Sequence, residues 1–266
     1  MDNVLFAFAL VTFAGLSTGI GSAIAFFAKK TSTKFLSVSL GFSAGVMIYV
    51  SMVEIFFKAQ ESLVGVLGDR NGAIITVVSF FGGMLFMALI DRLIPTAHNP
   101  HEIKTMESPA NSSKSKSQLL RTGLFTALAV AIHNFPEGLA TFISAQQEPS
   151  VAIPIVVAIA IHNIPEGIAV SVPIYYATGS RKKAFFYSFM SGLAEPLGAA
   201  VGYLILLPIM SEAVFGMLFA AVAGIMVFIS LDELLPSARE YGEHHLSIYG
   251  LVSGMAVMAI SLLLFI

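Results

Sequence analysis

Eight apolar stretches, each long enough to cross a lipid bilayer, follow one another along the chain. They cover roughly residues 4–28, 35–57, 73–94, 121–145, 151–176, 184–207, 212–235 and 247–266. A helix that crosses the hydrocarbon core needs about 20 predominantly apolar residues. The pattern therefore predicts an all-α integral membrane protein with eight transmembrane helices, in which residues 1–266 form a single domain.

The connections between these stretches are short, with one exception. Residues 95–120 are polar and rich in serine, a composition typical of segments that cannot bury enough apolar surface to fold. We therefore expect this connection to be a mobile loop.

Basic residues fall almost entirely on one side of the predicted spans. Twelve of the 14 lie on that side: Lys29, Lys30, Lys34, Arg92, Lys104, Lys114, Lys116, Arg121, Arg181, Lys182, Lys183 and Arg239. Only Lys58 and Arg70 lie on the other side. Because cytoplasmic loops carry an excess of Lys and Arg, the basic side, including the loop at 95–120, is predicted to be cytoplasmic. Both termini of this multi-pass protein of the inner or plasma membrane are then predicted to lie outside, in the periplasm or the extracellular space.

Composition agrees with a membrane protein and excludes some classes of function. The chain is 56% hydrophobic and 11% charged, whereas a typical soluble domain has about 25% charged residues. The net charge of -2 leaves no basic face for nucleic acid, so the bilayer is the expected surrounding and nucleic acid is not an expected partner. The absence of cysteine excludes disulfides and thiolate metal sites.

An internal repeat links the two ends of the chain. "AGVMIYVSMVEIFFKA" (44–59) resembles "AGIMVFISLDELLPSA" (223–238), and two shorter matches, 83–89 with 254–260 and 15–23 with 192–200, occur in the corresponding order. The first three spans thus recur as the last three. Two spans lie between the copies, so the second copy begins an odd number of spans after the first and crosses the membrane in the opposite direction. The second copy is therefore predicted to be inverted, as is typical of secondary transporters. The alternative, that small and apolar residues match by chance, stays open at this stage.

Two nearly identical polar boxes interrupt the fourth and fifth apolar stretches. They read "AVAIHNFPEGLATF" (129–142) and "AIAIHNIPEGIAVS" (158–171), and the sixth stretch carries a further mid-span acid in "SGLAEPLGA". Residues four apart share a helix face, so the histidine and the glutamate of each box are expected to point the same way. The candidate ligands are His133, Asn134, Glu137, His162, Asn163, Glu166 and Glu195.

Three carboxylates at the centre of a membrane need neutralisation, because each costs about 2.5–3.5 kcal/mol at a helix centre on insertion scales. A divalent cation supplies that charge, and imidazole with carboxylate suits zinc or iron(II) better than calcium or magnesium. Two overlapping sites result. The first is formed by His133, Glu137, His162 and Glu166, and the second by Asn134, Glu137, Asn163, Glu166 and Glu195. The alternatives are histidines that only bond neighbouring helices and, for Glu195, a proton carrier.

The paired "HNFPEG" and "HNIPEG" on consecutive spans, followed by "GLAEP" on the next, resemble the ZIP (Zrt/Irt-like) family of divalent-metal transporters, in particular its bacterial branch. The resemblance covers essentially the whole chain. It implies uptake of zinc, iron(II), manganese and other divalent cations into the cytoplasm through a binuclear centre at the residues just named. It further implies that Asp91, Asp232 and Glu233 line the exit path, that spans one, four, five and six slide against the rest, and that the protein is often a homodimer.

Two other functions can be weighed against transport. An intramembrane zinc hydrolase would carry HExxH with a free glutamate as base, whereas here the carboxylates are all assigned as ligands. A metal-sensing receptor would bind the ion and move nothing. The chain has no phosphate-binding loop of the GxxxxGK[ST] type. We therefore expect a transporter, not an enzyme, with no prosthetic group and with the metal ion as cargo.

Overall fold

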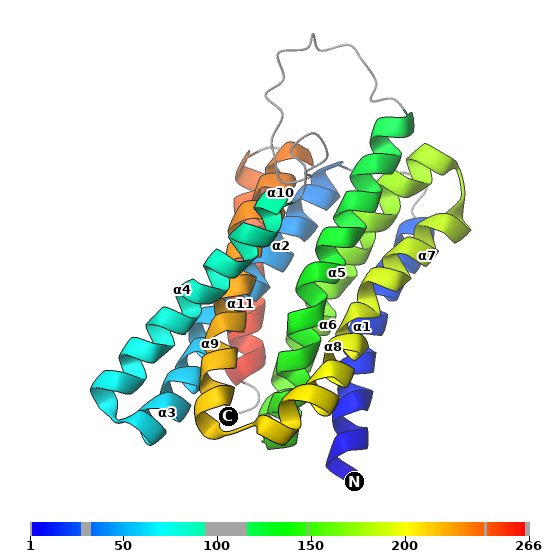
Figure 1. Cartoon of the computed structure of the whole chain (residues 1–266). Helices are drawn as coiled ribbons and strands as arrows, with labels where there is room; N and C mark the ends of the chain where they lie inside the picture. Colours follow the sequence, from blue (N-terminus) through cyan, green and yellow to red (C-terminus); the bar gives the residue numbers. More distant parts are fainter. Residues whose placement is uncertain (1, 28–32, 94–115, 148, 242–243, 264–266) are drawn as a thin grey trace.

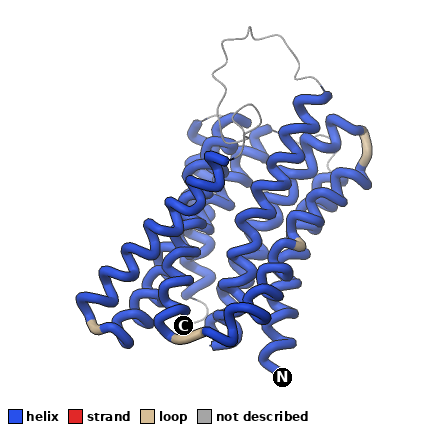
Figure 2. Tube along the Cα trace, in the orientation of Figure 1, coloured by secondary structure: helices blue, strands red, loops and turns tan. Residues whose placement is uncertain are grey.

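The structure, a computed structural model, describes residues 2–27, 33–93, 116–147, 149–241 and 244–263 (Figure 1). These residues form helices and short helical turns, and none of them lies in a strand (Figure 2). The α-helices are α1 (Asp2–Phe27), α2 (Thr33–Val50), α3 (Phe56–Leu67), α4 (Asp69–Leu93), α5 (Lys116–Gln147), α6 (Pro149–Thr178), α7 (Arg181–Gly192), α8 (Ala194–Val201), α9 (Glu212–Ile229), α10 (Leu235–Tyr241) and α11 (His244–Leu263). The short turns are the π-helical η1 (Ser51–Ile55), η2 (Gly202–Leu206) and η4 (Ser230–Leu234) and the 3₁₀ turn η3 (Leu207–Ile209).

Six helical stretches in the described part of the chain are long and apolar enough to cross a membrane. They are Val4–Ile24, Lys34–Leu67, Asp69–Arg92, Ile155–Thr178, Glu212–Arg239 and His245–Leu263. The two other predicted spans, 121–145 and 184–207, correspond to α5 and to α7 with α8. The prediction of an all-α membrane protein is confirmed at this level.

Several predicted span boundaries were too short. The span predicted at 35–57 continues through η1 and α3 to Leu67, because Ala59 and Leu63 are buried against α9 and keep the helix in the bundle. It ends where Gly68 takes a positive φ of 78°, a conformation that glycine adopts without steric cost. The polar segment predicted at 95–120 is in turn shorter than expected at its C-terminal end, because α5 begins at Lys116. The remainder, 95–115, lies outside the described residues.

The span predicted at 184–207 is broken into two helices. α7 ends at Gly192, Leu193 forms the junction, and α8 begins at Ala194. Pro196 has no N–H to donate to the carbonyl of Gly192, four residues earlier, so the helix loses a hydrogen bond and is weakened at this point. The break orients Glu195 in the first turn of α8.

The helices form two groups that lie side by side (Figure 1). One group contains α1, α5, α6, α7 and α8, and the other contains α2, α3, α4, α9, α10 and α11. The groups meet chiefly where α2 packs on α6 and where α5 approaches α9. The predicted boxes on α5 and α6 therefore belong to one group and face the other across this junction.

The glycine that ends each box allows its helix to approach a neighbour closely. A Cβ added at Gly138 would collide with the backbone carbonyl of Glu195, and one added at Gly167 would collide with that of Thr18. Both contacts are backbone to backbone, so no side chain could move aside. The two glycines thus seat α5 against α8 and α6 against α1.

Candidate metal centre

The two boxes lie about halfway along α5 and α6, which pack against each other. Their polar side chains are buried together with the acid of α8, and none is more than 3% exposed. The buried residues are His133, Asn134, Glu137, His162, Asn163, Glu166 and Glu195. The packing thus places every candidate ligand away from both lipid and water.

Each histidine pairs with the carboxylate of the other box. His133 Nε2 lies 3.0 Å from Oε2 of Glu166. His162 Nε2 lies 3.2 Å from Oε1 and 3.4 Å from Oε2 of Glu137. Two ligands of a tetrahedral zinc ion, with bonds of about 2.0–2.1 Å, are about 3.3 Å apart. The crossed pairs hold nitrogen and oxygen at close to that separation.

The asparagines use their amide nitrogens to tie the boxes to neighbouring helices. Asn163 Nδ2 donates to the carbonyl of Ala14 at 3.0 Å and also to Oε1 of Glu195. Asn134 Nδ2 donates to the carbonyl of Ser191 at 3.4 Å. Because these bonds use only the nitrogen atoms, they orient both side chains and leave the amide oxygens free to accept.

Besides Glu137 Oε1, which lies 3.2 Å from His162 Nε2, five buried polar atoms of the boxes and of α8 have no hydrogen-bond partner. They are His133 Nδ1, His162 Nδ1, Asn134 Oδ1, Asn163 Oδ1 and Glu195 Oε2. A buried polar atom left without a partner costs about 1–3 kcal/mol. Nitrogen and oxygen atoms of these types are ligands for zinc and similar ions, so a bound cation would satisfy atoms that the protein itself does not.

The carboxylates lie close enough to repel one another. Glu195 interacts electrostatically with both Glu137 and Glu166. In a buried setting of low dielectric constant such repulsion is much larger than in water. A positive ion or protons must therefore offset it whenever the three groups are ionised.

The four ligands expected for the first site form two pairs and not a single cage. In the described part of the chain, no group of three or more histidine, aspartate or glutamate side chains is arranged to hold a metal ion. Each imidazole is hydrogen-bonded to a carboxylate, which occupies the atoms that a cation would need. Since ligands must be deprotonated to bind metal, a cation would have to displace the shared proton and draw the pairs together.

One contact at the site was not foreseen from the sequence. The Ser43 hydroxyl, on α2 in the other group of helices, donates to Oε1 of Glu166 at 3.3 Å. Ser43 is fully buried. Its only sequence signal is a polar residue within the run "GFSAG", and such small residues more often serve close helix packing.

The three predicted exit residues are placed differently. Glu233, in η4, is 5% exposed, and its carboxylate interacts electrostatically with His133. Asp232 lies beside it in the same turn, partly exposed. Asp91 is partly exposed in the last turn of α4. The structure therefore buries Glu233 within electrostatic range of His133, while Asp91 lies at the end of another helix.

Comparison with known proteins shows one consistent relationship. The sequence profile of a family described as "ZIP Zinc transporter" matches residues 92–262. "Zinc transporter ZupT" of Streptococcus mutans is 66% identical over 267 residues, which is 100% of both chains.

Proteins of the same name from two other bacteria match over the same length. That of Clostridium perfringens is 63% identical over 279 residues, covering 100% of this chain and 98% of its own. That of Corynebacterium efficiens is 57% identical over 265 residues, covering 100% and 99%. The similarity therefore extends over both groups of helices.

Proposed function

Because the chain belongs to the ZIP family of zinc transporters, we propose that it carries zinc and related divalent cations across the membrane into the cytoplasm. The resemblance inferred from the boxes is thereby confirmed, and an intramembrane hydrolase receives no support. The observation that carries the proposal is the pair of crossed histidine–carboxylate contacts buried between α5 and α6.

The cargo is held by two overlapping sites that share two carboxylates. His133 and His162 with Glu137 and Glu166 supply nitrogen and oxygen ligands suited to zinc. The unpartnered oxygens of Asn134 and Asn163 and the free oxygen of Glu195 supply the second, harder set. Glu137 and Glu166 bridge the two ions. This assignment rests on burial and on the atoms left without partners.

The oxygen-rich second site extends the cargo beyond zinc. Carboxylate and carbonyl ligands suit manganese, and a mixed nitrogen and oxygen set suits iron(II). We therefore propose transport of these ions together with zinc, as cargo and not as resident cofactors.

We also propose that the chain forms eight spans built as an inverted repeat of the first three and the last three. Matched helix contacts support this proposal. A Cβ at Gly45 would collide with the carbonyl of Leu251, and one at Gly224 with that of Phe80. The repeat aligns Gly45 with Gly224 and Phe80 with Leu251, so the two contacts are copies of each other.

Further features of the repeat agree with inversion. The π-helical turns η1 and η4 begin at Ser51 and Ser230, which the repeat aligns. Gly15 and Gly192 are also aligned, and a Cβ at either would collide with the carbonyl of the other. Such a reciprocal contact is expected for a pair near a two-fold axis. Alignment by chance does not predict these coincidences.

The remaining features of the proposal follow from the basic loops and from the family resemblance. Both termini lie outside a cell inner or plasma membrane, since positive residues mark the cytoplasmic side. Asp91, Asp232 and Glu233 line the exit, and the protein assembles as a homodimer. Of these acids, Glu233 is supported by its interaction with His133.

Movement of one group of helices past the other would carry the ion. The candidate ligands lie on α5, α6 and α8, all in one group, whereas Ser43 and Glu233 belong to the other. With every ligand at most 3% exposed, the site is closed to both sides in this structure. A sliding step would therefore break the contact of Ser43 with Glu166 and open the site.

Reconstituted vesicles test the function directly. Purified protein in proteoliposomes should take up zinc, and to measurable extents iron(II) and manganese, from a panel of divalent ions. Each ion is measured with and without a pH gradient, because the ligands exchange protons for metal. Binding of zinc to the protein without accumulation inside the vesicles would contradict transport and favour a receptor.

A further inference from the structure

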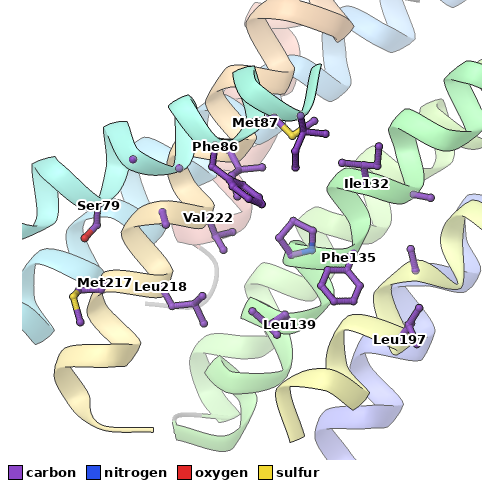
Figure 3. A pocket seen from close by; sticks show the side chains of 18 of the residues that line it. Ser79, Phe86, Met87, Ile132, Phe135, Leu139, Leu197, Met217, Leu218 and Val222 are labelled. Atoms are coloured by element: carbon purple, nitrogen blue, oxygen red, sulfur yellow. The ribbon is translucent and has the colours of Figure 1, made fainter. Parts of the chain in front are cut away.

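An apolar groove of about 900 Å³ runs between the two groups of helices. Its walls are α4 and α9 on one side and α5 and α8 on the other. Figure 3 shows Phe86 and Val222 on one wall opposite Phe135 and Leu139 on the other. The groove is lined by apolar residues of the first box and is separate from the buried polar side chains of the boxes, which lie between α5 and α6.

The lining of the groove suits hydrocarbon and no polar ligand. Ser79 is the one residue with a polar side chain among those that line it. Glycine and alanine at several wall positions, among them Gly82, Ala131 and Ala194, leave the space unfilled. Water there would find too few hydrogen-bond partners, and an empty groove would forfeit dispersion contacts along its walls. Because α4 and α9 belong to membrane-crossing stretches, the medium outside is lipid.

The length of the groove corresponds to one leaflet of the bilayer. Along α4 the lining extends from Ser79 to Ile90, which is about 16 Å at the helical rise of 1.5 Å per residue. Half of a hydrocarbon core of about 30 Å is about 15 Å. The groove therefore accommodates the hydrocarbon chain of a lipid that enters from one side.

Charges at the two ends of the walls distinguish those sides. Exposed Arg92 lies in the last turn of α4 beside the partly exposed Asp91, and exposed Arg121 lies in the early turns of α5 at the same end of the bundle (Figure 1). The opposite end carries exposed Asp69 and Glu212, which begin α4 and α9, together with exposed Arg70. Among these wall residues, basic side chains outnumber acidic ones at the first end and acidic ones outnumber basic ones at the second, so a phosphate is favoured at the first end.

We propose that this groove binds an acyl chain of an anionic membrane phospholipid, with the phosphate at the end that carries Arg92 and Arg121. The bound chain lies against Phe135 and Pro136, on the face of α5 opposite the buried His133 and Glu137. It also fills the space between the two groups of helices. The lipid is then a structural part of the junction at which we propose that the groups slide.

Filling the groove with a side chain tests the proposal. Gly82 faces the groove, and a Cβ added there meets nothing within 4 Å, so Gly82→Leu is sterically allowed. Gly65 has the same freedom on α3 but does not line the groove, so Gly65→Leu is the matched control. Native mass spectrometry of protein exchanged into phosphatidylglycerol counts the lipids retained.

We expect Gly82→Leu to retain the lipid about tenfold less well, since an added isobutyl group displaces several methylenes. Gly82→Ala should give a smaller loss, and Gly65→Leu should give none. The Ala variant keeps the test valid if Leu impairs folding. Equal retention in all variants would overturn the proposal, as would a change in the monomer–dimer balance with unchanged lipid, which would make the groove a contact between copies.

Replacing both arginines tests the headgroup. In Arg92→Gln/Arg121→Gln protein, the preference for phosphatidylglycerol over phosphatidylcholine should disappear while phosphatidylcholine is still retained. An unchanged preference would overturn the placement of the phosphate. Neither readout measures transport, so the lipid proposal and the transport function fail independently.

Discussion

At the scale of single residues, the proposed site depends most on Glu137 and Glu166. Each is paired with a histidine of the other box, and each belongs to both proposed sites. Both are almost fully buried, so any charge on them must be offset locally. A cation that binds between the boxes satisfies this requirement and also reaches the unpartnered atoms nearby.

Loss of either shared carboxylate should therefore stop transport. We expect Glu137→Gln and Glu166→Gln each to lower zinc uptake by at least about 100-fold, since even residues that only orient a metal ligand are worth 10- to 100-fold. The substitution keeps the size of the side chain and removes its charge. Uptake of radioactive zinc by proteoliposomes measures the effect, with Glu61→Gln on exposed α3 as the control. Near-normal uptake in either variant would contradict the bridging role.

The histidines should affect zinc more than manganese. Imidazole suits zinc, whereas manganese prefers oxygen ligands. We expect His162→Ala to reduce zinc uptake about tenfold more than manganese uptake. Competitive uptake of the two isotopes in one vesicle preparation gives the ratio directly, and exposed His245→Ala is the comparison variant. An equal loss for both ions would show that the ring only supports the structure.

The sequence predicted which polar side chains would be buried together, and the structure buries them, but their contacts could not be predicted. Two copies of one polar box in apolar helices identify His133 and His162, because ionisable residues are rare at the centres of membrane helices and are usually functional there. Spacing along one helix does not specify which carboxylate of a neighbouring helix each ring meets. Ser43 was missed for the same reason, since it reaches Glu166 from a helix far away in the sequence.

At the scale of elements, the helical type of the long segments follows from their apolar length, whereas the breaks and the irregular turns do not. The helix of span six breaks at Leu193, shortly before Pro196. In contrast, Pro136 lies inside the continuous α5. Neighbouring helices decide whether a proline bends or breaks a helix, and these neighbours are not visible in local sequence. The π-helical turn at Ser51 likewise has no local sequence signal.

Close helix contacts at the box glycines should matter for stability. We expect Gly138→Val and Gly167→Val to destabilise the protein by about 1–3 kcal/mol, as overpacking does, because each new side chain meets a backbone carbonyl. At about 2–4 °C per kcal/mol for a chain of this size, the unfolding midpoint in detergent should fall by several degrees. Gly65→Val, with open space around it, should leave the midpoint unchanged. Equal midpoints for all three would contradict the close seating of α5 and α6.

At the scale of the whole molecule, the sequence repeat predicted which spans correspond but not how they pack. The division of the helices into two groups was expected only from the family resemblance. Long-range contacts such as that of α2 with α11 leave no periodic pattern in the sequence. The structure adds where the groups touch. Leu36 of α2 clusters with Ile168 and Val172 of α6, so this cluster joins the group that holds the ligands to the other group.

Covalent linkage across that junction should stop transport if the groups slide. The chain has no cysteine, so a Leu36→Cys/Val172→Cys pair can be bridged by a short thiol-specific cross-linker with no competing site. We expect zinc uptake to fall at least about tenfold after cross-linking and to return after reduction of a cleavable bridge. Uptake by proteoliposomes before and after reduction measures both steps, and the two single-cysteine variants control for modification alone.

A linkage within one group separates sliding from a general loss of flexibility. Ala14 of α1 and Ile159 of α6 belong to one buried cluster inside the group that carries the ligands. Cross-linking Ala14→Cys/Ile159→Cys should leave uptake close to its initial level, because both helices move together in the proposed step. Full activity with the Leu36–Val172 bridge in place would exclude sliding at this junction and require the ion to pass through a fixed path. Loss of activity with both bridges would instead point to motions inside the ligand group, since the site must still open to release its ion.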